Sequence, residues 1–128
     1  FRQRRLERMQ AGISYRNTVQ NVALEVKTAL DSVGLNFRLI EQARDARLAA
    51  SEVLRALLVE KETIRSLTVE RLDLELSRQE TLAQRERDEV AALADYQRSI
   101  ATLHAAMGTA LERNRIDFVV PDPVDAER

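Results

Sequence analysis

The sequence predicts an all-α protein, built as a long antiparallel α-helical hairpin that is similar to a coiled coil. Residues that break helices are scarce, because the only glycines are Gly12, Gly34 and Gly108, and both prolines, Pro121 and Pro123, lie near the end. Apolar residues recur at alternating steps of three and four, the heptad pattern of helices that pack side by side. Aromatic residues make up only 4% and Trp is absent, so we expect a thin core of Ala, Leu and Val.

The first helix is expected over about residues 4–62. Its apolar line predicts these positions at the helix interface: Val19, Val22, Val26, Leu30, Val33, Phe37 and Ile40. A continued heptad would next reach Arg44 and Arg47, but the apolar residues that follow are instead Ala43, Ala46, Ala50, Val53 and Leu57. This three-residue discontinuity predicts a stammer, at which the coil is locally overwound.

The second helix is expected over about residues 69–114. Its predicted interface line is Leu72, Leu76, Gln79, Ala83, Glu86, Val90, Leu93, Tyr96, Ile100, Leu103, Met107 and Ala110. Residues 78–89 are so polar that we expect this stretch to face water. The hairpin is expected to fill residues 1–120, and residues 121–128 to form an extended or disordered tail.

The tip of the hairpin is placed at about residues 63–68. Ser66 and Thr68 are candidate N-caps of the second helix, and Glu70 puts an acid in its first turn. One unbroken helix over residues 6–111 is the alternative, and the change of the apolar line favours the turn. A tip near residue 67 places position i opposite a position near 134 − i.

That pairing rule makes two specific predictions, good to about one helical turn. Phe37 is expected to lie near Tyr96 or Gln97, and Val33 near Ile100 or Ala101. As the largest side chain of the line, Phe37 is expected to be buried.

Several function classes are disfavoured by the composition. The net charge is −1 without a basic stripe, which disfavours nucleic-acid binding. No apolar run approaches the roughly 18 residues of a membrane span, so this part of the protein is expected to make no membrane contact. Cysteine is absent, His104 is the only histidine, and no glycine-rich phosphate loop occurs. We therefore expect no enzyme activity, no catalytic residues, no cofactor and no metal site.

A cluster of acids surrounds the expected tip: Glu60, Glu62, Glu70, Asp73 and Glu75. Basic side chains, Lys61, Arg65 and Arg71, lie among them. The cluster is interpreted either as a solvated, salt-bridged helix end or as a cation-attracting, partner-docking rim.

Two stretches carry a family resemblance over about residues 4–114. The returning helix has Leu72-Asp73, Arg78-Gln79, Asp95-Tyr96, Leu103, Ala106 and Gly108, and the descending helix has Tyr15-Arg16-Asn17, Glu25-Val26 and Ala29-Leu30. In this order and spacing the chain resembles the periplasmic helical part of TolC-like outer-membrane efflux channels. It departs from the family at the turn, where Ser66-Leu67-Thr68 replaces a frequent Gly-x-Ser/Thr.

The resemblance implies a structural function. The hairpin would be one stave of the periplasmic tunnel of an outer-membrane channel, with this part of the chain in the periplasm. The family's partners are a periplasmic adaptor and an inner-membrane pump, its channels are homotrimers, and the adaptor would dock at the tip residues Ser66, Leu67 and Thr68. Two alternatives remain: the helical hairpin of a periplasmic adaptor (membrane-fusion) protein, and a generic coiled-coil scaffold.

Overall fold

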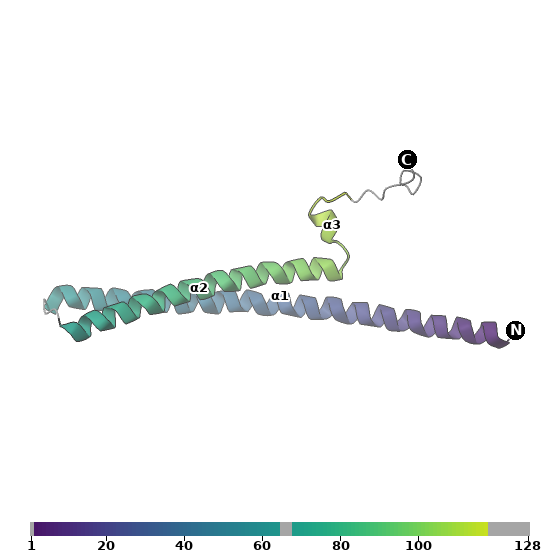
Figure 1. The fold of residues 1–128 in the computed structure, drawn as a ribbon, viewed down its shortest axis with the longest axis horizontal. Helices are drawn as coiled ribbons and strands as arrows, with labels where there is room; N and C mark the ends of the chain where they lie inside the picture. The colour runs from purple at the N-terminus through teal and green to yellow at the C-terminus, as the bar shows by residue number, and fades with distance from the viewer. Residues whose placement is uncertain (1, 65–67, 118–128) are drawn as a thin grey trace, which may run out of the picture. The chain divides into compact units, whose positions relative to one another are not determined.

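The structure, a computed structural model, describes residues 2–64 and 68–117. Of these, 93% are helical and none forms a strand. Helix α1 covers Arg2–Ile64, α2 covers Val69–Ala106 and the short α3 covers Ala110–Arg113. The protein is therefore all-α, with two long helices joined by a short turn (Figure 1).

The chain divides into two units, Phe1–Ala29 with Ala101–Arg128, and Leu30–Ile100. The second unit holds the later half of α1, most of α2 and the contacts between them. Within it α2 lies alongside α1 (Figure 1). Phe37 contacts Tyr96 with ring centroids 6.0 Å apart, which confirms the predicted pairing of these two residues.

Helix α1 begins and ends within two residues of the expected bounds, so Thr63 and Ile64 belong to the helix rather than to the tip. The expected second helix of residues 69–114 is interrupted: α2 ends at Ala106 and a separate turn of helix follows. Gly108 causes this break, because its φ of 72° is a left-handed conformation that ends a helix at low cost.

The break is a Schellman motif. The Thr109 amide donates to the His104 carbonyl at 2.9 Å, and the Gly108 amide donates to the Ala105 carbonyl at 3.0 Å. Both bonds satisfy carbonyls that the last turn of α2 would otherwise leave without partners.

A second motif of this kind ends α3. Arg115 has a φ of 54°, its amide donates to Glu112, and the Ile116 amide donates to Leu111. Of the expected tail, the structure describes nothing, because residues 121–128 lie outside the described ranges.

In the second unit the half-buried residues of α1 follow one unbroken heptad line. The prediction of a stammer in this line is therefore wrong. The line is Val33, Asn36, Ile40, Ala43, Arg47, Ala50, Leu54, Leu57 and Lys61. Ala46 and Ser51 are half-buried beside it. The heptad continues through Arg47, where the apolar pattern predicts a slip, because the Arg47 side chain forms an ion pair with Glu89.

Between residues 72 and 93 the predicted interface line of α2 is mostly displaced by one residue, whereas Tyr96, Ile100 and Leu103 of that line are half-buried as predicted. From Arg71 to Ser99 the half-buried line is Arg71, Glu75, Leu82, Glu89, Ala92 and Tyr96, with Ser99 buried, and Ala83 and Asp88 are half-buried beside it. Leu72, Leu76, Val90 and Leu93, expected at the interface, are exposed. Phe37 is also 51% exposed, so the prediction that it is buried is wrong. The contact line of α2 therefore mixes charged residues, Glu75 and Glu89, with apolar ones such as Leu82.

Very little of the described chain is buried. Ala29 is the one apolar residue that is buried there, and Ser99 is the one buried polar residue. Two helices in contact along a single line cannot cover their other faces, so most large apolar side chains stay in contact with water.

Candidate docking site

The expected docking residues lie at the short connection between α1 and α2. Ser66 and Leu67 are outside the described residues, so the structure neither supports nor contradicts a role for them. Thr68 is described, is exposed, and directly precedes α2. The site can therefore be built from Thr68 and from the two helix ends that flank it.

Thr68 caps α2. Its side-chain oxygen Oγ1 accepts a hydrogen bond from the Arg71 amide at 3.4 Å, and its carbonyl accepts one from the Leu72 amide at 3.2 Å. This is the bond pattern of an N-cap residue, whose side chain satisfies a free amide of the first turn. Glu70 lies in that turn, where its negative charge is favourable. Thr68, one of the two candidate N-caps, is thus confirmed as a cap, and Ser66 lies outside the described residues.

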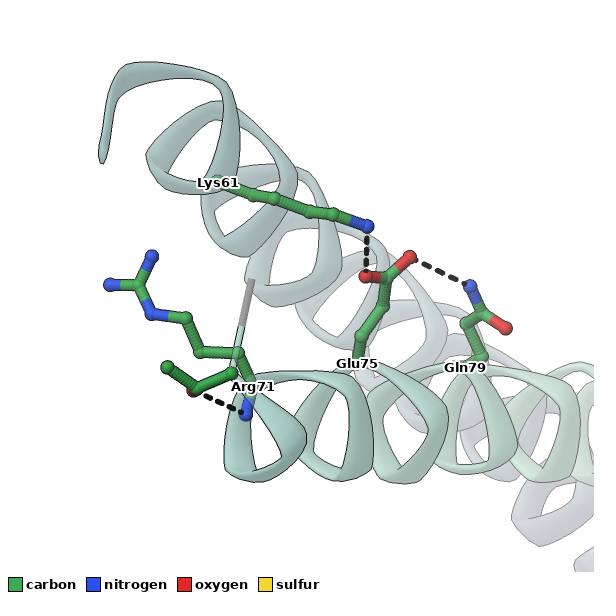
Figure 2. Close-up of polar contacts among 5 residues, drawn as sticks. Lys61, Arg71, Glu75 and Gln79 are labelled. Carbon is green, nitrogen blue, oxygen red and sulfur yellow. Dashed lines mark hydrogen bonds and ion pairs between the residues drawn. The ribbon is translucent and has the colours of Figure 1, made fainter. Parts of the chain in front are cut away.

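Two ion pairs join the helix ends beside this cap. Lys61 of α1 contacts Glu75 of α2 with an Nζ–Oε2 distance of 2.6 Å, and Gln79 donates to the other Glu75 oxygen at 3.5 Å (Figure 2). Arg71 contacts Glu60 at 3.0 Å. The Glu75 side chain is only 17% exposed, so its charge is largely removed from water and held by Lys61 and Gln79.

These contacts divide the acid cluster of the expected tip. Glu60 and Glu75 pair with cations of the opposite helix, although Glu60 stays exposed, and Glu62, Glu70 and Asp73 are exposed as well. The pairing fits the interpretation of the cluster as a salt-bridged helix end. The exposed acids remain the part of it that can face a partner.

The cross-helix pairs were not predicted from the sequence. The signal that points to them is the pairing rule itself, which places Lys61 and Glu75 opposite each other within a turn. The predicted interface lines follow apolar residues, so they pass beside Lys61 and Glu75 rather than through them.

His104 is engaged in the corner between α2 and α3. Its Nδ1 lies 2.9 Å from the Thr109 hydroxyl, and its Nε2 contacts the Arg113 guanidinium. Across residues 2–64 and 68–117, no group of three or more His, Cys, Asp or Glu side chains is arranged to hold a metal ion. In the same ranges no helix is both long and apolar enough to cross a membrane.

The exposed face of α2 carries a shallow hollow. It is lined by Ala83, Glu86, Arg87, Val90, Ala91 and Ala94. Ala83, Glu86 and Val90 belong to the heptad line that the sequence predicted as an interface. Small side chains at this spacing let a second helix approach closely.

Comparison with known proteins found no matching family model, no matching curated protein and no matching solved structure.

Proposed function

We propose that the chain is an antiparallel helical hairpin that forms one stave of the periplasmic tunnel of a TolC-like outer-membrane channel. Two long helices joined by a short turn are the shape such a stave requires. The order and spacing of the motifs in both helices support the family assignment. The hairpin performs no chemistry in this proposal; it encloses a path for exported substrates.

One observation carries the proposal furthest: α2 presents a heptad line of exposed apolar residues. Leu76 is 63% exposed and Val90 is 66% exposed, with Leu72 and Leu93 on the same line. Apolar residues at heptad spacing are the pattern of a helix that packs against another helix. Because α1 covers the adjacent line of α2, the partner for this one comes from outside the pair. A ring of staves supplies such a partner on every hairpin.

The partners follow from the family resemblance. The assembled channel is a homotrimer in the outer membrane, and an adaptor linked to an inner-membrane pump docks at Ser66, Leu67 and Thr68. Exposed Thr68 and the exposed acids Glu62 and Glu70 flank this place. An apolar Leu67 with charged residues close to it in the sequence fits a small docking patch.

The apolar line is tested in the full-length protein by Val90→Glu. We expect the variant to remain folded but to lose assembly of the channel, because a charge at the centre of a helix interface is costly. Glu62→Gln is the control. Glu62 is an exposed residue of α1 that is not part of the apolar line of α2, so this variant should assemble normally. Native mass spectrometry of the detergent-extracted protein measures assembly, and an intact Val90→Glu oligomer contradicts the proposed use of this face.

The tip is tested by Leu67→Asp in the same protein. We expect membrane insertion and assembly to persist and export to be lost, while Leu67→Met exports normally because it keeps an apolar side chain. Normal export by Leu67→Asp removes the tip from the proposal. An isolated chain that unfolds with this substitution would instead show that Leu67 holds the two helices together.

The hairpin of a periplasmic adaptor is the second candidate. The ion pairs Arg47–Glu89 and Lys61–Glu75 join α1 and α2 directly, as a hairpin that stands alone requires. The full-length sequence distinguishes the candidates: barrel strands flank a channel stave, lipoyl-like β segments flank an adaptor hairpin, and neither flanks a scaffold coiled coil.

A further inference from the structure

Three successive layers of the contact between α1 and α2 repeat at intervals of one heptad. Arg47 pairs with Glu89, and Lys61 pairs with Glu75, each pair two heptads from the other on both helices. Leu54 and Leu82 lie midway, so this register places them opposite each other. All six side chains belong to half-buried residues.

The charges of these layers are segregated by helix. Both cations come from α1 and both anions come from α2. The exposed fractions of the side chains are 30% for Arg47 and 21% for Glu89, and 38% for Lys61 and 17% for Glu75. At this burial a cation that met another cation would lose much of its hydration without gaining a partner.

The same layers penalise like pairings of helices from two copies of the chain in which these layers meet. Two α1 helices packed antiparallel about Leu54 bring Arg47 against Lys61. Two α2 helices packed about Leu82 bring Glu75 against Glu89. Parallel packing in register sets each charge against its own copy.

A slip of one heptad is penalised as well. It sets Arg47 opposite Leu82 or Tyr96 and leaves Glu89 without its cation. The free energy of apolar packing changes little on such a slip, because apolar side chains recur at every heptad. The charge pairs, in contrast, are lost.

We propose that Arg47, Lys61, Glu75 and Glu89 form a pairing code: the face of α2 that carries the two anions recognises a helix with two cations two heptads apart. The helix selected is an α1 in one register, which the short turn supplies from the same chain, and a second copy's like helix is rejected. This inference rests on the hairpin in the proposed function and not on the channel.

Charge reversal tests the code in the complete chain. Arg47→Glu with Lys61→Glu is expected to lower the melting temperature by about 10 °C or more, since both layers then hold like charges. Arg44→Glu with Arg55→Glu, at exposed positions of α1, makes the same change of net charge and should shift it by no more than about 3 °C. Adding Glu75→Lys and Glu89→Arg to the first variant should restore the midpoint. A fourfold variant as unstable as the twofold one overturns the proposal.

Replacing all four charges by leucine separates recognition from stability. Disulfide formation reports the register, because the chain contains no cysteine of its own. Ala43→Cys with Ala92→Cys should crosslink in the native register, whereas Ala43→Cys with Arg85→Cys reports a slip of one heptad, about 10 Å along the helix.

The chain with its four native charges should crosslink almost entirely through positions 43 and 92, within one chain. The variant with four leucines should melt at the same temperature as the native chain or at a higher one. It should nevertheless form the slipped crosslink or crosslinks between chains in tens of per cent of molecules. A leucine variant that stays monomeric and crosslinks only in the native register would show that the charges determine neither the register nor the partner helix, and it would overturn the proposal.

Discussion

Arg47 of α1 and Glu89 of α2 are separated by 42 residues in the chain and form an ion pair across the two helices. Both side chains are mostly withdrawn from water, on the half-buried line where a helix pair usually carries apolar residues. This pair keeps the heptad of α1 continuous through a position at which the sequence pattern predicted a slip.

Removing one member of the pair leaves the other charge half-buried without compensation. We expect Glu89→Ala to lower the free energy of unfolding by about 1–2 kcal/mol, less than for a fully buried pair because some solvent reaches both groups. Glu52→Ala is the control, since Glu52 pairs with Arg55 on the exposed side of α1. It should change stability by less than about 0.5 kcal/mol. Urea unfolding followed by circular dichroism measures both, and equal effects would show that the interhelical position adds nothing.

Phe37 and Tyr96 lie with their ring centroids 6.0 Å apart at an angle of 57°, within the range of favourable aromatic pairs. Because Phe37 is 51% exposed, Phe37→Ala should cost about 1–2 kcal/mol, below the roughly 3 kcal/mol of a buried phenylalanine. A double-mutant cycle with Tyr96→Leu should give a coupling of about 0.5–1 kcal/mol. A coupling of zero would mean that the rings do not interact in solution.

Gly34 and Gly108 should respond in opposite ways to alanine. Gly34 lies inside α1 with nothing within 4 Å of an added Cβ, so Gly34→Ala should stabilise the chain by about 0.5–1 kcal/mol. Gly108 has equally open surroundings but a φ of 72°, so Gly108→Ala should destabilise the Schellman turn by about 1 kcal/mol. The thermal midpoint measures the first effect, and amide exchange at Gly108 and Thr109 measures the second. Effects of the same sign would contradict the assignment of α1 and of the break.

Arg115 holds a left-handed conformation with a φ of 54° that glycine adopts more easily. We expect Arg115→Gly to strengthen the last turn of α3 by roughly 1 kcal/mol, seen as slower exchange of the Ile116 amide. Arg113→Gly, inside α3, should have the opposite effect. Faster exchange at Ile116 in Arg115→Gly would show that the arginine side chain contributes more than its backbone costs.

Thr68 supplies the cap of α2, so Thr68→Ala should cost about 1 kcal/mol and fray the first turn of the helix. Thr63→Ala is the control, because the Thr63 hydroxyl bonds to the Val59 carbonyl inside α1 and caps nothing. Its effect should be neutral or slightly stabilising. Exchange of the Arg71 amide distinguishes the two, and an unchanged rate in Thr68→Ala would place the cap elsewhere.

The amino-acid sequence by itself determined that this protein is made of long helices, where the connection between them falls, and that Phe37 lies near Tyr96. These follow from local causes: the scarcity of glycine and proline, the period of the apolar residues, and the length of chain on each side of the turn. The end of α2 at Ala106 depends on the left-handed conformation of Gly108, which the periodic pattern of the sequence does not show.

Only the tertiary structure decided which face of each helix meets the other. A heptad pattern shows that a helix has a packing face, but α2 carries two adjacent faces, one apolar through Leu76 and Val90 and one charged through Glu75 and Glu89. The rotation of α2 depends on ion pairs with Arg47 and Lys61, whose partners lie across the turn and are invisible to a period measured along one helix. A shift of the contact line by one residue leaves the local pattern unchanged and yet replaces Leu76 and Val90 by Glu75 and Glu89 in the contact, because the interaction that selects it exists only between the two helices.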